Sequence, residues 1–181
     1  MTDTCTALTL IIPQEFTMAI NVIRCKYDHA YPRWMPHINF MFPFVPPEQF
    51  EDAKERLTTA FANVKPFDVS LNDIGYFTQK GNVSFHLKTN DQSKLDNLFQ
   101  IIRTALPEVP VKHPTFKAHM TLGKCKKREF DTIKNEIENT IQLHMVKIKV
   151  DAVHIIERSH EDKELPFHII HRIPLGENVV G

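Results

Sequence analysis

The sequence contains little glycine and none of the common nucleotide-binding or hydrolase signatures. Only five of its 181 residues are glycine, and none of them forms a Walker loop or a GxGxxG motif. The GxSxG and HExxH signatures of serine hydrolases and zinc proteases are absent as well. A glycine-rich loop that cradles phosphates is therefore nearly excluded.

Cysteine and long apolar runs are also scarce. The three cysteines, Cys5, Cys25 and Cys125, are scattered and form no CxxC pair, so neither a disulfide framework nor a structural zinc site is expected. The apolar run 8–12 is too short for a signal peptide, and no stretch is long enough to cross a bilayer. We expect a cytoplasmic protein without a membrane partner, although a nuclear location is also compatible with the sequence.

Charge is balanced over the whole chain but not along it. Lys plus Arg and Asp plus Glu both number 22, so no global attraction to long nucleic acid or to anionic lipid is expected. The window 109–128, in contrast, contains no acidic residue. Its basic residues are Lys112, Lys117, Lys124, Lys126, Lys127 and Arg128. This window predicts a local anion site.

Two short segments with the same pattern stand out, 82 positions apart. In the first, His37 and Asn39 alternate with apolar residues, and in the second His119 and Thr121 do the same. Side chains of a strand alternate between its two faces, so each segment places an imidazole beside a hydrogen-bonding group and turns an apolar back to the core. Two such strands that face one cleft would provide an acid, a base and two anchors for a substrate.

The remaining periodicity predicts an α+β fold with a motif strand followed by a helix in each half. The residues 67–77 and 82–89 are expected to form a hairpin because a four-residue link ending in glycine joins them. We expect one bilobed domain over residues 1–175, with two antiparallel-rich sheets and outer helices around a central cleft, and a loose tail over 176–181. Strands are expected at 6–12, 37–42, 67–77, 82–89, 116–123, 145–158 and 165–175, and helices at 15–26, 48–64, 91–106 and 129–142.

The paired motifs resemble the two His-Φ-[Ser/Thr]-Φ signatures (Φ is hydrophobic) of the 2H phosphoesterase superfamily, also called the 2′-5′ RNA ligase-like family. The segment 34–44, with Trp34 before the first motif and a proline and aromatics after it, is similar to the eukaryotic and viral branch. The resemblance implies a bilobed α+β fold and metal-independent phosphodiesterase activity without a cofactor. It also implies that His37 and His119 act as general acid and base, with their roles not assigned.

The same resemblance suggests how the substrate would be held. Asn39 and Thr121 would bind the nonbridging phosphate oxygens, and Lys117 or Lys124 would add positive charge. Asn39 departs from the family, which usually has Ser or Thr there, but an amide can still donate a hydrogen bond. The expected partner is a nucleotide or short oligonucleotide, such as a 2′-5′ linked oligonucleotide, a 2′,3′-cyclic phosphate end or a small cyclic nucleotide, and no obligatory protein partner is evident.

Two other functions are compatible with the same residues. The chain could be a nucleotide or RNA-end binding module with weak catalysis, or a metal hydrolase in which histidines join Asp28 and Asp151. The lack of closely spaced ligand pairs argues against the metal hydrolase. The other strand histidines, His86 and His154 among them, are expected to be structural, and Trp34 either packs in a cluster of aromatic residues or stacks on a base.

Overall fold

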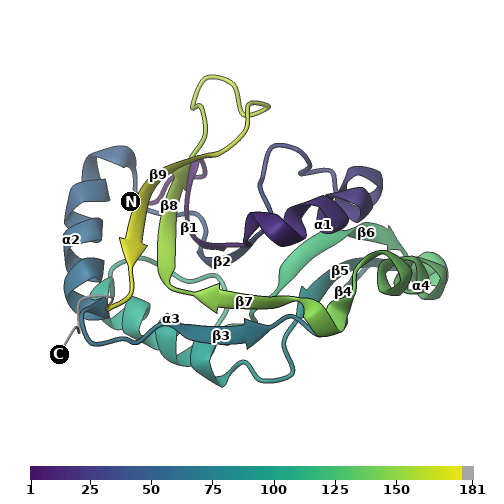
Figure 1. Ribbon diagram of the computed structural model, residues 1–181. Coiled ribbons are helices and arrows are strands. Elements are labelled where there is room, and N and C mark those ends of the chain that lie inside the picture. The colour runs from purple at the N-terminus through teal and green to yellow at the C-terminus, as the bar shows by residue number, and fades with distance from the viewer. Residues whose placement is uncertain (177–181) are drawn as a thin grey trace.

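A four-stranded antiparallel sheet with the order β2-β1-β8-β9 forms one lobe of the computed structural model, which describes residues 1–176 (Figure 1). Strand β1 is apolar and β-branched, as buried central strands usually are, and its side chains are almost all buried. The predicted strand at 37–42 is β2 and pairs with β1. The bounds are β1 Thr6–Ile11, β2 His37–Met41, β8 Ala152–Glu157 and β9 His168–Pro174.

The second lobe contains a three-stranded antiparallel sheet with the order β4-β5-β6, so the strand of the second motif pairs with the predicted hairpin. The hairpin turns at Lys80 and Gly81, both of which have a positive φ. Strand β6 begins at Met120, directly after His119, and extends into the basic segment, later than the 116–123 expected. The bounds are β4 Asp73–Gln79, β5 Asn82–Lys88 and β6 Met120–Lys126.

Two predicted strands are each divided into two. Residues 67–77 were expected to be one arm of the hairpin, but β3 (Phe67–Ser70) leaves it and pairs with β7 (Lys147–Val150). The run 145–158 likewise divides at Asp151 into β7 and β8, which belong to different sheets. Both predictions of a single strand were wrong because the partner strands are distant in sequence, and hydrophobic alternation does not reveal where a strand changes sheets.

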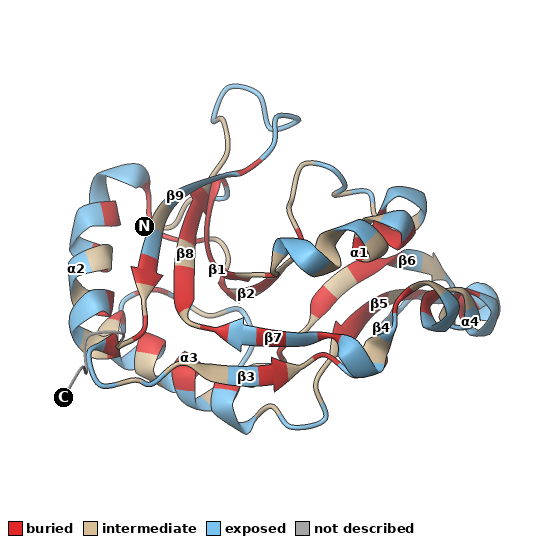
Figure 2. Cartoon of the chain, in the orientation of Figure 1, coloured by how far each residue is buried: buried red, intermediate tan, exposed pale blue. Residues whose placement is uncertain are grey.

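Four helices lie on the outer side of the two larger sheets (Figure 1). Helix α2 packs against β9 and α3, and α1 packs against β6 and α4. Figure 2 shows their buried residues on the sides that face the sheets. The predicted helices are confirmed, although short 3-10 turns precede two of them. The bounds are α1 Gln14–Tyr27, α2 Phe50–Phe61, α3 Ser93–Ala105 and α4 Phe130–Thr140, with 3-10 turns at Pro47–Gln49, Lys127–Glu129 and Leu143–Met145.

Each motif strand carries a β-bulge three residues after its histidine. In β2, Thr9 is opposite Asn39 and Leu8 is opposite Met41, so Phe40 is the extra residue. In β6 the partners of β5 skip Leu122 in the same way. A bulge shifts the alternation of side chains by one position. Two residues that lie three positions apart, one on each side of the bulge, therefore face the cleft together. In a regular strand they would lie on opposite faces.

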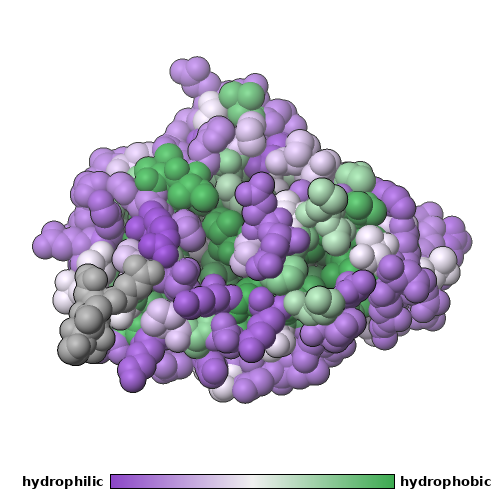
Figure 3. All heavy atoms as spheres, in the orientation of Figure 1, coloured by the Kyte–Doolittle hydropathy of each residue, from purple (hydrophilic) through white to green (hydrophobic). Residues whose placement is uncertain are grey.

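A hollow between the two lobes exposes hydrophobic side chains and is bordered by hydrophilic ones (Figure 3). The α+β, bilobed fold predicted from the sequence is therefore confirmed. Within residues 1–176, no helix has the length and apolar character that crossing a bilayer requires. Of the predicted tail, Gly176 is held by a hydrogen bond from its N–H to the Val64 carbonyl oxygen, and 177–181 lie outside the described residues.

Candidate active site

His37 is the first residue of β2 and is partly buried between the lobes. Its Nδ1 lies 2.6 Å from the carbonyl oxygen of Met35. A carbonyl oxygen only accepts hydrogen bonds, so Nδ1 carries the proton and Nε2 of the neutral ring has a free lone pair. The backbone thus selects the tautomer of this histidine.

His119, directly before β6, has the same arrangement. Its Nδ1 lies 2.6 Å from the carbonyl oxygen of Lys117, again two residues earlier in the chain. The two motifs therefore agree in local geometry as well as in sequence, and each imidazole has Nε2 available for a proton transfer.

The fold brings the two histidines near each other. Strands β2 and β6 are in contact across the lobes, and the charge of His119 affects the pKa of His37. Burial is the main cause that lowers the pKa of His37, to about 4, and the nearby positive charges of Arg24 and His119 lower it further. His37 is therefore neutral at pH 7.

Trp34 and Arg24 fix the loop that precedes His37. The Trp34 ring stacks on the His37 ring, with 4.6 Å between centroids and 22° between planes, and also contacts Phe42 and Phe167. Packing in an aromatic cluster is thus the role the structure gives Trp34. Arg24 is 2% exposed, pairs with Asp28 at 2.9 Å and donates to the Trp34 carbonyl oxygen at 2.8 Å. Sequence reasoning missed Arg24, because a basic residue in an amphipathic helix normally indicates an exposed position.

Gln92 fixes the segment that precedes His119, as Trp34 and Arg24 fix the loop that precedes His37. Its side-chain amide donates to the Phe116 carbonyl oxygen at 2.7 Å, and its side-chain oxygen accepts a hydrogen bond from the Ala118 N–H at 3.0 Å. These two bonds fix the irregular segment that leads to the histidine. Gln92 was also missed, because it lies 27 positions before His119 and belongs to no recognisable motif.

A third histidine, His86 of β5, lies beside His119. The ring centroids are 5.2 Å apart, and Phe77 lies against both rings. His86 is opposite Thr121 in the sheet, so the two side chains share a face. Burial, followed by the charges of His119 and Lys88, lowers the pKa of His86 to about 4. From the sequence His86 was expected to be structural, and nothing in the sequence indicates that it neighbours the second motif.

The other predicted site residues are distributed as follows. Asn39 and Thr121 are partly buried and share the faces of their strands with the motif histidines. In a regular strand, Lys124 would point away from Thr121, but the bulge at Leu122 pairs it with Ser84 and turns it to the face of Thr121. The side chain of Lys117 is exposed, and the residue contributes its carbonyl oxygen to His119.

Comparison with known proteins identifies the family. A model of the 2′-5′ RNA ligase superfamily matches residues 12–162, a range that includes both motifs. The chain belongs to this superfamily. A Staphylococcus haemolyticus protein, provisionally named a phosphoesterase, is 28% identical over 133 residues, which cover 72% of this chain and 78% of that protein.

Solved structures share the fold of this 2′-5′ RNA ligase superfamily member at low sequence identity. The protein TT0787 of Thermus thermophilus has a TM-score of 0.63 at 15% identity, covering 94% of this chain and 97% of that one. Escherichia coli LigT has a TM-score of 0.60 at 16% identity, covering 97% and 99%. Usb1 of Kluyveromyces marxianus has a TM-score of 0.55 at 9% identity, covering 94% and 98%.

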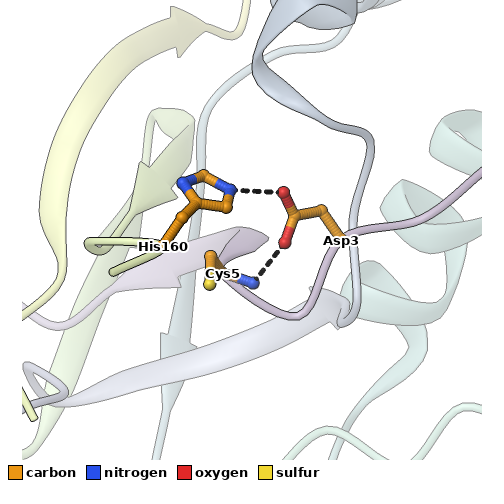
Figure 4. Close-up of side chains that lie close together, drawn as sticks. All are labelled: Asp3, Cys5 and His160. Atoms are coloured by element: carbon orange, nitrogen blue, oxygen red, sulfur yellow. Dashed lines mark hydrogen bonds and ion pairs between the residues drawn. The ribbon is translucent and has the colours of Figure 1, made fainter. Parts of the chain in front are cut away.

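One cluster of potential metal ligands lies elsewhere in this superfamily member (Figure 4). His160 bonds to the Asp3 carboxylate at 2.5 Å, and the other carboxylate oxygen of Asp3 accepts a hydrogen bond from the Cys5 N–H at 2.7 Å. These groups satisfy one another and attach the N-terminal segment to the loop after β8. They lie at the end of β1 opposite to His37, and among residues 1–176 no metal-capable group includes His37 or His119.

Proposed function

We propose that the protein is a metal-independent phosphodiesterase that uses His37 and His119 as general base and general acid. Its substrates are 2′-5′ linked oligonucleotides, 2′,3′-cyclic phosphate ends or small cyclic nucleotides. The observation that carries the proposal is the shared geometry of the two imidazoles, each with Nδ1 bonded to a carbonyl oxygen two residues earlier. The superfamily and the name of the staphylococcal relative support phosphoesterase activity in general.

The fixed tautomers suit the chemistry of a phosphodiester. Cleavage needs one group that takes a proton from the attacking hydroxyl or water and another that donates a proton to the leaving oxygen. With Nδ1 occupied, Nε2 is a base in the neutral ring and an acid in the protonated ring. Each such contribution is typically worth about 10²- to 10⁴-fold in rate.

The surroundings of the two histidines favour one assignment of roles. His37 has its pKa lowered to about 4, so it is neutral and able to accept a proton at pH 7. His119 is then the proton donor.

Asn39, Thr121 and Lys124 hold the phosphoryl group in this proposal. The amide and the hydroxyl donate to the nonbridging oxygens, and Lys124 adds positive charge on the same face as Thr121. Lys117 acts first through its carbonyl oxygen, which orients His119. Its exposed side chain contributes to the positive potential of the surrounding basic segment.

The substrate class rests on nucleotide complexes of related folds. LigT has been solved with 3′-AMP and Usb1 with uridine monophosphate. A nucleotide or short oligonucleotide suits a chain with a net charge of zero, and no protein partner is required in this proposal. Membership of the eukaryotic or viral branch and a cytoplasmic or nuclear location stay predictions.

Substitution of the two histidines tests the proposal. His37→Ala and His119→Ala should each reduce turnover more than about 100-fold, and the double variant should be little worse because the two groups act together. The assay is a panel of 2′-5′ and 3′-5′ dinucleotides, cyclic phosphates and cyclic dinucleotides, with products resolved. His144→Ala, which removes an exposed imidazole, is the control. More than about a tenth of the wild-type rate in either single variant would contradict the assignment.

The alternative is a binding module of the same fold. The observation in its favour is Asn39, which replaces the Ser or Thr that the family usually has. A wild-type protein that binds nucleotides tightly and turns over no member of the panel would favour this alternative over the enzyme.

A further inference from the structure

A row of polar side chains crosses the four-stranded sheet from the first motif to the opposite edge. Asn39 of β2 is opposite Thr9 of β1, Thr9 is opposite His154 of β8, and His154 is opposite Arg172 of β9. Directly opposed residues of neighbouring strands have side chains on the same face. Because Asn39 shares its face with His37, the whole row lies on the face that carries the first catalytic histidine.

The packing of β9 confirms which face this is. His171 lies 3.2 Å from Glu51 of α2, and Ile173 belongs to the main hydrophobic core. Arg172, between them in sequence, points to the opposite face and is exposed. Figure 1 shows α2 on the outer side of this sheet, whereas the other face is turned toward the second lobe.

Several polar atoms of the row are buried without a hydrogen-bond partner. They are Oγ1 of Thr9, Oδ1 of Asn39 and Nδ1 of His154, three of the five such side-chain atoms within residues 1–176. Thr9 is 0% exposed. Buried polar groups are normally paired, so their concentration in one row that leads away from the catalytic histidine calls for a physical explanation. A ligand that supplies the missing partners is one.

The end of the row is suited to a negatively charged group. Arg172 carries a fixed positive charge with a planar array of donors, which suits phosphate oxygens, and Asp151 lies 3.5 Å from it. Burial, and then the charge of Arg172, lowers the pKa of His154, so its ring is neutral at pH 7 and can both donate and accept a hydrogen bond. The hydroxyl of Thr9 and the amide of Asn39 suit sugar hydroxyls or phosphate oxygens.

We propose that this row is a second substrate site, in which Arg172 and His154 bind a terminal phosphate while the scissile phosphodiester lies between His37 and His119. The proposal rests on the proposed function and makes the substrate more specific. Neighbouring strands are about 4.8 Å apart, so the row extends about 14 Å from Asn39 to Arg172. A linear trinucleotide, in which two nucleosides separate the terminal phosphate from the scissile phosphodiester, can span that distance, whereas a mononucleoside cyclic phosphate cannot.

The test compares a 2′-5′ linked trinucleotide with and without a 5′-phosphate. Dissociation constants are measured by calorimetry in the His119→Ala protein, so that the result does not depend on turnover. The phosphorylated trinucleotide should bind about 10- to 100-fold more tightly, which is the range expected for a charge-assisted hydrogen bond. Adding Arg172→Gln should abolish this preference, and adding Arg172→Lys should keep part of it.

Two further variants separate the row from general effects of charge and folding. Thr9→Val preserves the shape of the side chain and should weaken binding of both trinucleotides, because it removes the buried hydroxyl. Arg103→Gln removes an exposed arginine of α3 and should leave the preference unchanged. Equal affinity for the two trinucleotides, or a preference that survives Arg172→Gln, would overturn this second site. Failure of the proposed function would appear separately, as a wild-type protein that cleaves neither trinucleotide.

Discussion

Replacement of His86 should make the protein more resistant to acid. The side chain is 4% exposed, and burial, with the charges of His119 and Lys88, lowers its pKa from 6.5 to about 4. The unfolded chain binds a proton at this position more readily than the folded chain. The neutral ring therefore stabilises the fold fully above about pH 6.5, and this contribution is lost as the pH falls toward 4.

The magnitude follows from the change in pKa. One pKa unit corresponds to about 1.4 kcal/mol, so a change of roughly 2.5 units represents about 3 kcal/mol between the two ends of the range. Between pH 7 and pH 5, about 2 kcal/mol of unfolding free energy should be lost through this residue. His86→Phe keeps a ring between Phe77 and His119 and cannot take up a proton.

Urea denaturation at pH 7 and pH 5 measures the effect. The unfolding free energy of the wild type should fall by about 2 kcal/mol more than that of His86→Phe over this interval. His86→Gln, which also lacks the proton equilibrium, should resemble the Phe variant even if it is less stable at both pH values. His144→Phe, at an exposed position, serves as the control. Equal losses in the wild type and both His86 variants would refute the reasoning.

Three other outcomes are expected. In the dinucleotide assay, Asn39→Thr should retain activity and Asn39→Leu should lose it, because only threonine keeps a hydrogen-bond donor beside His37. Equal rates in the two variants would show that Asn39 does not touch the substrate. The pH profile of kcat/KM should be bell-shaped and unchanged by excess chelator, and a chelator-sensitive plateau at high pH would favour a metal-bound hydroxide. Gly123→Ala should lower the unfolding free energy, measured by urea denaturation, by about 1–3 kcal/mol, because the new Cβ would lie 2.6 Å from the Tyr27 carbonyl oxygen. An unchanged urea midpoint would contradict this close contact.

Local features of the fold and of the site were predictable from the sequence. The helices follow from apolar spacing, and His37 and His119 stood out because two matched motifs lie in strand-like segments. Their shared hydrogen bond to the carbonyl oxygen two residues earlier adds physical meaning to the motif. The preceding residues, Met35 and Lys117, do not resemble each other, so their common role was invisible in the sequence.

The features that could not be predicted depend on pairing between distant segments. Strand β3 pairs with β7, nearly 80 positions later, which is why the expected long arm of the hairpin was wrong. His86 comes to lie beside His119 because β5 pairs with β6, and the row from Asn39 to Arg172 needs the register of three strand pairs. Alternation within a strand determines which side chains share a face but not which strand will be its neighbour.

The two bulges have a consequence for redesign of the site. In each motif strand the residues available to the cleft occupy positions 0, +2 and +5 counted from the histidine, which are His37, Asn39 and Phe42 in one and His119, Thr121 and Lys124 in the other. Position +4 is turned to the interior in both strands. Beyond +2, a new substrate contact must therefore be introduced at +5 and not at +4. Deletion of the extra residue at either bulge would restore regular alternation and leave the residues that follow it on their present faces.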